Sequence, residues 1–188
     1  MKFVLFHGAF GSPQGNWFPE LTEKLTTLGQ IVIAPQFPVD SWDEVTKNGP
    51  HMPFKNHSLD AWLKTFEKEV LPHITKKEKI CFIGHSLGCV FALHVVTKYA
   101  IKLDCAIFVS PFLDKLNSLW QFDHVNQTFY KTDFDMLKKN IPISYVLYSD
   151  NDPYVSKNHA VLFSHILDSS FIFVRKAGHM NSEVNLNE

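Results

Sequence analysis

The stretch that most constrains the fold of this chain is KICFIGHSLGCVFA, residues 79–92. It begins with an apolar run, residues 80–84, that is typical of a fully buried strand, and apolar residues return at helical spacing from Val90. Only a very short turn can join these two elements. That turn is GHSLG, residues 84–88, a G-x-S-x-G pattern in which the serine at the apex of a strained strand-to-helix turn lifts its hydroxyl clear of the sheet.

The glycines of this pattern have steric roles. Gly84 and Gly88 lie where a Cβ atom would press against the neighbouring strand and helix. A pattern this short often occurs by chance, but its place between an apolar strand and a helix favours a nucleophilic Ser86 over a turn with a buried serine. The helix N-terminus beyond it adds a partial positive charge and the free N–H of Leu87.

Composition and charge exclude several classes of function. A chain of 188 residues with 45% hydrophobic and 20% charged residues is typical of one soluble globular domain, residues 1–188. A formal net charge of −1 argues against nucleic acid or an anionic membrane as the partner. No apolar run is long enough to cross a bilayer, and MKFVLFHG lacks the features of a secretory signal, so we expect a cytoplasmic location.

Cysteines and ligand motifs predict neither disulfides nor a metal site. Cys81, Cys89 and Cys105 fall in the predicted strands and the central helix without C-x-x-C spacing, so we expect buried, reduced thiols. The sequence contains no phosphate loop, no dinucleotide fingerprint, and no His or Cys cluster at ligand spacing. We therefore expect no cofactor and no metal.

Strands and helices alternate along the chain. Besides residues 80–84, buried strands are predicted over residues 3–7 and 104–109, and further strands over residues 30–34, 141–148 and 170–174. Helices are predicted over residues 18–28, 59–74 and 156–167, whereas residues 35–57 show no regular period and are interpreted as a long surface loop. This order predicts an α/β fold, a doubly wound and mainly parallel sheet with helices on both faces. The loops at the carboxyl ends of such strands carry the chemistry.

Residues 110–140 are unusually aromatic for a connection. They are interpreted either as short helices that lie over the carboxyl edge of the sheet or as core filling beneath a long connection. Five aromatic residues of the chain are predicted to form an apolar pocket for an acyl group or a side chain. These are Phe10, Trp17, Phe112, Trp120 and Phe129.

A nucleophilic serine needs a histidine base and a carboxylate that orients the histidine, because its hydroxyl is a poor nucleophile at neutral pH. The order on such a fold is serine, acid, histidine. The histidines that follow the elbow at any distance are His124, His159, His165 and His179, and of these His159 and His165 fall within a predicted helix. His179 follows the last predicted strand and Gly178, where the chain must turn back sharply, and is the predicted base.

The acid is predicted at the end of the strand that closes at Tyr148. Asp152 begins a stiff turn that aims its carboxylate toward the histidine, whereas Asp150 is expected to tie down the turn by accepting backbone N–H groups. Three aspartates of the aromatic segment are weaker candidates and are interpreted as solvated surface charge. They are Asp123, Asp133 and Asp135.

The oxyanion hole needs two N–H groups, one from Leu87 and one from the loop HGAFG after the first strand. Ala9 is the predicted second donor, with Phe10 as the alternative. His7 is expected either to shape this loop or to be a buried structural histidine. His85 is expected to pack behind the elbow.

Four motifs in order, HGAFGSPQGNWFP, GHSLG, SDNDPYVS and AGHMNSE, make the chain resemble the α/β-hydrolase superfamily, and specifically its small serine hydrolases of the retinoblastoma-binding-protein type. The resemblance spans nearly the whole chain, including the run KTDFD. It implies a minimal hydrolase without a large cap domain and, by motif match, a triad of Ser86, Asp152 and His179. Members of this family include esterases and peptidase-like enzymes.

These observations together predict a serine hydrolase that cleaves an ester, thioester or amide bond of a small molecule through an acyl-enzyme. Carboxylesterase-like activity is expected, with peptidase and thioesterase activity left open, and no partner protein is indicated. The alternative is a catalytically silent protein of the same fold that binds a partner protein or a small ligand. The complete set of serine, aspartate and histidine argues against this alternative.

Overall fold

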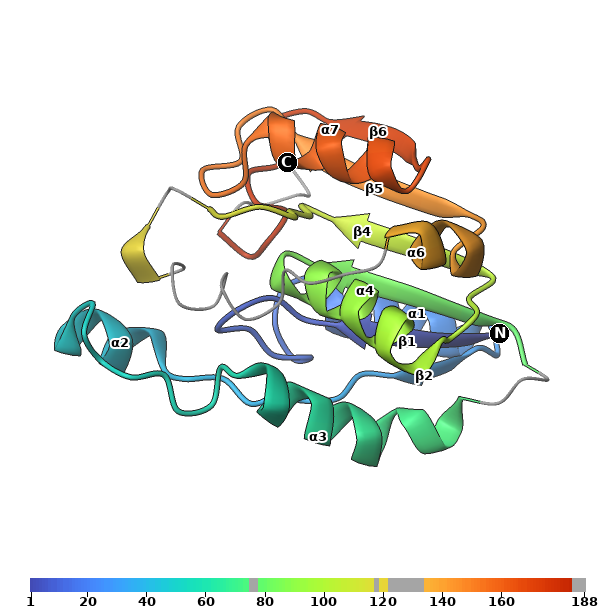
Figure 1. Cartoon of the computed structure of the whole chain (residues 1–188), viewed down its shortest axis with the longest axis horizontal. Helices are drawn as coiled ribbons and strands as arrows, with labels where there is room; N and C mark the ends of the chain where they lie inside the picture. Colours follow the sequence, from blue (N-terminus) through green and yellow to red (C-terminus); the bar gives the residue numbers. More distant parts are fainter. Residues whose placement is uncertain (75–77, 117–118, 122–133, 184–188) are drawn as a thin grey trace.

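The computed structural model describes residues 1–74, 78–116, 119–121 and 134–183 of the chain. Its centre is a parallel six-stranded sheet with the order β2-β1-β3-β4-β5-β6 (Figure 1). The strands are β1 (Lys2–Phe6), β2 (Ile31–Ile33), β3 (Ile80–His85), β4 (Cys105–Val109), β5 (Ser144–Ser149) and β6 (Ser170–Val174). The predicted α/β fold with a doubly wound sheet is confirmed, and no large cap domain occurs in the described ranges.

The register of the sheet brings the functional loops together. Phe6 of β1 pairs with Gly84 of β3, and His85 pairs with Val109 of β4. Tyr148 of β5 pairs with Phe173 of β6. Since all strands are parallel, the loops that follow them meet at one edge of the sheet.

Helices cover both faces of the sheet, but unequally (Figure 1). On one face, α1 (Phe18–Thr27) packs Phe18 against Leu5 and Ile83. The other face carries α3 (Leu59–Glu69), α4 (Leu87–Tyr99), α6 (Phe134–Asn140) and α7 (Lys157–Ile166). Because α4 is covered by the sheet on one side and by helices on the other, it is apolar nearly all round.

An aromatic cluster fills the core beneath the loop after β1. Phe37 stacks on Trp62 with ring centroids 4.8 Å apart and meets Phe91 edge-on at 5.1 Å. Phe6, at the end of β1, lies 4.9 Å from Phe82 of β3. All five side chains are fully buried, and each contributes about 1.5–3 kcal/mol through burial. The loops at the functional edge of the sheet therefore pack on a fully buried aromatic core.

Three predicted boundaries differ from the structure. Residues 35–57 contain a short helix, α2 (Trp42–Asn48), which has no apolar period because Val45 is its single buried residue. The helix predicted over residues 59–74 ends at Glu69 and continues as a 3₁₀ turn, η1 (Leu71–His73), since a proline there cannot donate to an α-helical ladder. The strand predicted from residue 141 begins at Ser144.

The aromatic segment is only partly described. Phe112 and Leu116 are buried in the core, as the core-filling interpretation predicts, whereas Trp120 is 38% exposed. Phe129 lies outside the described residues, as do two of the three weaker acid candidates, Asp123 and Asp133. Among the described helices, none combines the length and the apolar character needed to cross a membrane.

The cysteines agree with the prediction in all but one respect. All three are free thiols, and Cys81 and Cys89 are buried. Cys105 is only half-buried, because it lies at the start of β4 on the sheet face that α1 covers. 

Candidate active site

The elbow has the strained geometry that the G-x-S-x-G pattern predicts. Ser86 lies between β3 and α4 with φ 53° and ψ −121°, a conformation that non-glycine residues rarely adopt. A Cβ atom on Gly88 would lie 2.2 Å from the carbonyl oxygen of Phe6, and one on Gly84 would lie 2.8 Å from Cys89 Cα. The two glycines therefore let the strand and the helix approach closely enough to hold Ser86 at the apex.

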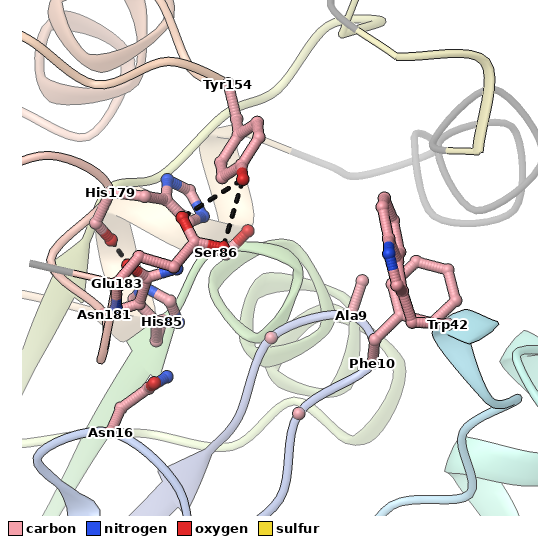
Figure 2. Close-up of a pocket in the computed structure, with 12 residues that line it drawn as sticks. Ala9, Phe10, Asn16, Trp42, His85, Ser86, Tyr154, His179, Asn181 and Glu183 are labelled. Carbon is pink, nitrogen blue, oxygen red and sulfur yellow. Dashed lines mark hydrogen bonds between the residues drawn. The ribbon is translucent and has the colours of Figure 1, made fainter. Parts of the chain in front are cut away.

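Asp152 and His179 form a hydrogen-bonded pair. His179 Nδ1 lies 2.8 Å from Asp152 Oδ2 and 3.0 Å from Oδ1, and both side chains are almost completely buried. The N–H groups of Tyr154 and Val155 donate to Asp152 Oδ1 at 2.9 and 3.0 Å, which fixes the carboxylate. With Nδ1 donating to Asp152, His179 Nε2 is the acceptor nitrogen. Figure 2 shows the His179 imidazole beside Ser86.

Three side chains that precede Asp152 hold the loop before His179. Ser149 Oγ accepts the N–H of Ala177 at 2.8 Å, Asp150 Oδ1 accepts that of Lys176 at 2.7 Å, and Asn151 Oδ1 accepts that of Gly178 at 2.8 Å. Asp150 thus accepts a backbone N–H, but that of Lys176 in the loop before His179, rather than N–H groups of its own turn as the sequence predicts. The run SDND anchors the histidine loop with its first three residues and reaches His179 itself with the fourth.

A second histidine supports His179 from behind. His85 Nε2 donates to the His179 carbonyl at 2.8 Å, and the two rings lie 4.9 Å apart. Burial is the main reason that the pKa of His85 is lowered to about 3, so its ring is neutral. Trp17 Nε1 donates to the carbonyl of Met180 at 2.9 Å. His85 and Trp17 therefore fix two consecutive backbone carbonyls, those of His179 and Met180.

The loop after β1 is held by two buried histidines. His7 lies 2.8 Å from the Gly8 carbonyl through Nδ1, and its Nε2 accepts the N–H of Phe37 at 3.0 Å. His57 Nε2 accepts the N–H of Phe10 at 3.0 Å. Burial lowers the pKa of both histidines to about 4, so both are neutral acceptors at pH 7.

The tautomer of His57 follows from its surroundings. Both ring nitrogens face a backbone N–H group, Nε2 that of Phe10 with 3.0 Å between the nitrogens and Nδ1 that of Asp40 with 3.2 Å, and Asp40 Oδ2 lies 3.8 Å from Nδ1. A neutral imidazole has a single acceptor nitrogen, and the nearby carboxylate favours the proton on Nδ1. Nε2 is then the acceptor for Phe10.

These contacts distinguish the two candidates for the second oxyanion donor. The Phe10 N–H is engaged by His57, whereas the Ala9 N–H has no acceptor within the described part of the chain. Leu87 is the first residue of α4, so its N–H has no intrahelical acceptor. The geometry therefore favours Ala9 over Phe10 as the partner of Leu87.

A pocket of about 250 Å³ lies over Ser86 and His179 (Figure 2). Of the five aromatic residues predicted to bind substrate, it contains Phe10 alone among those described. Trp17 and Phe112 pack in the core instead, and Trp120 does not line this pocket. The complete lining is Gly8, Ala9, Phe10, Gly11, Asn16, Trp42, His85, Ser86, Tyr154, His179, Asn181 and Glu183.

Sequence reasoning missed five side chains of this lining, and it expected His85 to pack behind the elbow, whereas His85 also lines the pocket. Tyr154, Asn181 and Glu183 lie inside the motifs SDNDPYVS and AGHMNSE, so their closeness to Asp152 and His179 was an available signal. Asn16 follows the glycine-rich loop, and Trp42 lies in the stretch interpreted as a surface loop. In the described ranges, no group of three or more His, Cys, Asp or Glu residues is arranged to hold a metal ion.

A family model described as "Serine hydrolase" matches residues 3–188. The chain belongs to the serine hydrolase family. This membership supports a hydrolytic function for the pocket. A comparison with curated protein sequences finds no significant match.

Solved structures share the fold of this serine hydrolase. The ydeN gene product of B. subtilis superposes with a TM-score of 0.78 at 22% identity, covering 97% of this chain and 89% of that chain. The monoacylglycerol lipase of Paleococcus ferrophilus gives a TM-score of 0.66 at 14% identity, covering 95% and 85%. Est1E of Butyrivibrio proteoclasticus, solved with ferulic acid, gives 0.65 at 15%, covering 96% and 82%. These likenesses establish the α/β-hydrolase fold, and the narrower retinoblastoma-binding-protein type stays a prediction.

Proposed function

We propose that this serine hydrolase cleaves an ester, thioester or amide bond of a small molecule, with Ser86 as the nucleophile. One observation carries the proposal. Ser86, at the apex of a strained elbow, lines the same pocket as His179, whose imidazole lies 2.8 Å from the Asp152 carboxylate. A serine, a neutral base and a carboxylate that orients the base are the groups that acyl transfer to serine requires.

In the first half of the reaction, Ser86 Oγ attacks the carbonyl carbon while its proton passes to His179 Nε2. Asp152 keeps the proton on Nδ1 and stabilises the imidazolium that forms. The N–H groups of Leu87 and Ala9 donate to the developing oxyanion, and one such donor contributes about 10²–10³ in rate. His179 then gives its proton to the leaving group, and the acyl group stays on Ser86.

In the second half, water attacks the acyl-enzyme. His179 Nε2 accepts a proton from the water, and the oxyanion again faces Leu87 and Ala9. Collapse of this intermediate releases the acid and returns the proton to Ser86 Oγ. Carboxylesterase activity is the form of this chemistry that the motif resemblance to small serine hydrolases of the retinoblastoma-binding-protein type supports. The length and composition of the chain support a single domain over residues 1–188, and a cytoplasmic location stays a prediction.

Labelling with a fluorophosphonate, followed by intact-mass analysis, tests the proposal. We expect stoichiometric labelling of the wild-type chain, none in Ser86→Ala, and a rate about 10³-fold lower in His179→Ala. Ser156→Ala and His165→Ala are matched controls, because both residues are exposed and neither lines the pocket, and both should label like the wild type.

One result would overturn the proposal. If the folded wild-type chain neither reacted with the probe nor hydrolysed simple esters, Ser86 would not be an activated nucleophile. The catalytically silent binding protein would then be the better account of this pocket.

A further inference from the structure

The two sides of the pocket differ in chemistry. Figure 2 shows Phe10 and Trp42 on one side of Ser86, with Asn16, Asn181 and Glu183 on the other. The Phe10 and Trp42 rings meet edge-on with centroids 5.0 Å apart, which makes the first side a compact apolar wall. We refer to Asn16, Asn181, Glu183 and Tyr154 as the polar wall.

Glu183 has a defined place in the polar wall, although it is exposed. The Tyr154 hydroxyl donates to both of its carboxylate oxygens at 3.1 Å. Its own N–H donates to Asn181 Oδ1 at 3.2 Å, and the N–H of Ser182 donates to Asn16 Oδ1 at 3.0 Å. The backbone before the carboxylate is therefore tied to the β1 loop, 166 residues away in the chain.

Tyr154 keeps its role as a donor at neutral pH. Burial and the neighbouring Glu183 carboxylate raise the pKa of Tyr154 above its ordinary value, so the phenol retains its proton. The Tyr154 ring also meets the His179 ring edge-on at 5.1 Å. The polar wall is thus continuous with the proposed catalytic base.

The charge of this wall points to the chemistry of its ligand. The described lining residues include the Glu183 carboxylate but no lysine or arginine. A carboxylate has about four lone-pair sites, so the single hydroxyl of Tyr154 leaves acceptor capacity. The side-chain oxygens of Asn16 and Asn181 already accept backbone N–H groups. The Tyr154 ring in the same wall adds attraction for a cation.

We propose that the polar wall is a subsite for a cationic group of the substrate, an ammonium or a guanidinium, while a hydrocarbon group on the other side of the scissile bond packs on Phe10 and Trp42. This inference rests on the proposed hydrolysis at Ser86, whose products it leaves unchanged. It makes Glu183 the residue that sets specificity for charge.

Matched esters test the inference. In one pair the charge is on the alcohol, choline butyrate against its neutral isostere 3,3-dimethylbutyl butyrate. In the other it is on the acid, ethyl 4-(trimethylammonio)butanoate against ethyl 5,5-dimethylhexanoate. We expect kcat/KM to favour the cationic ester about fivefold in one of the two pairs, since an ion pair at an exposed site contributes little binding free energy. Glu183→Gln should bring that ratio close to one, and Glu44→Gln, an exposed glutamate on α2 that does not line the pocket, should leave it unchanged.

The outcomes separate this inference from the proposed function. Hydrolysis of the neutral esters with a ratio near one in both pairs would leave the hydrolase intact and overturn the cation subsite. A wild-type ratio that persists in Glu183→Gln would assign the selectivity to another group and overturn the role of Glu183.

A binding measurement covers the case in which no ester is hydrolysed. Butyltrimethylammonium is titrated calorimetrically into Ser86→Ala and into the double variant Ser86→Ala with Glu183→Gln. The inference predicts that the double variant binds about fivefold more weakly, and that this difference in affinity shrinks as the salt concentration rises. Equal affinity for the two variants, or no binding to either, would contradict it.

Discussion

Two loops present backbone N–H groups to the pocket, and they are held in opposite ways. The elbow, residues 84–88, takes its shape from the strand before it, the helix after it and the two glycines between them. The loop after β1, residues 8–11, is held by side chains distant in sequence, above all by His57, 47 residues from Phe10. One half of the site is thus built locally, and the other depends on buried hydrogen bonds that tertiary packing supplies.

The largest effect is expected at the elbow. Gly88→Ala would place a Cβ atom 2.2 Å from the Phe6 carbonyl oxygen, so β1 and α4 would have to separate. We expect a loss of about 4 kcal/mol or more in the free energy of unfolding, measured by urea denaturation. Gly15→Ala is the matched control, because its Cβ would meet the Ser12 oxygens at an ordinary 3.6 Å. Equal stability of the two variants would show that the elbow tolerates a side chain there.

Lowering the pH should destabilise the folded chain through the two buried histidines that hold the β1 loop. The folded-state pKa of His7 and of His57 is lowered from 6.5 to about 4, mainly by burial. Between these values the unfolded chain binds protons that the folded chain does not, so stability is full above pH 6.5 and falls as the pH drops toward 4. Each histidine contributes a loss on the order of 3 kcal/mol across this window.

Urea midpoints at pH 7, 5.5 and 4.5 measure this slope. His57→Gln removes one of the two titrating groups and should flatten the slope, whereas His85, whose pKa is lowered to about 3, adds equally to both proteins. An unchanged slope in His57→Gln would mean that His57 binds protons equally in the folded and the unfolded chain, and that its pKa is not lowered by folding.

Removal of the His57 acceptor should weaken catalysis more than binding. In His57→Leu the Phe10 N–H loses its partner, and the neighbouring Ala9 N–H loses its fixed direction. We expect kcat for a simple ester to fall by about tenfold to a hundredfold with a smaller change in KM, since an oxyanion donor acts in the transition state. His57→Gln can place an amide oxygen near Nε2 and should recover part of kcat. Equal losses in the two variants would point to a packing role alone.

The smallest effect is expected in the loop before His179. This loop is intermediate between the elbow and the β1 loop, because Asp150 of the run SDND binds the N–H of a residue only 26 positions further along the chain. Asp150→Ala removes one exposed acceptor of a backbone N–H and should cost about 1 kcal/mol in unfolding free energy. Asp152→Ala, which separates His179 from its carboxylate, should instead abolish nearly all fluorophosphonate labelling. If Asp150→Ala lost labelling to the same degree, the assignment of the two aspartates would be reversed.

Much of the fold was predictable because apolar periodicity reports burial directly. The six strands were predicted within a few residues, since the central strands of a parallel sheet are covered on both faces and read as continuous apolar runs, and the edge strand β6 keeps an apolar run although Phe171, Ile172 and Phe173 are exposed. The short helix α2 was not predicted. Its N-cap, Ser41, accepts the Glu44 N–H, but Val45 is its single buried residue. A single buried residue gives no period to detect.

The candidate site divides in the same way. Ser86, Asp152 and His179 were predicted from motif and chain order, and the structure places Asp152 beside His179 and puts Ser86 and His179 in one pocket. The pocket wall was predicted less well. Trp17 and Phe112 are aromatic for reasons of core packing, and residue type alone does not separate a core aromatic from a lining aromatic.

The sequence by itself determined the parallel sheet, the elbow and the order of the serine, aspartate and histidine, because each depends on residues that are neighbours in the chain or share one strand edge. Tertiary structure alone decided that His57 binds the Phe10 N–H and that Asn16 and Tyr154 hold the segment carrying Glu183. These contacts join segments 29 to 166 residues apart. Hydrogen bonds between such distant partners leave no periodicity or spacing in the sequence, so only the packed core brings them into register.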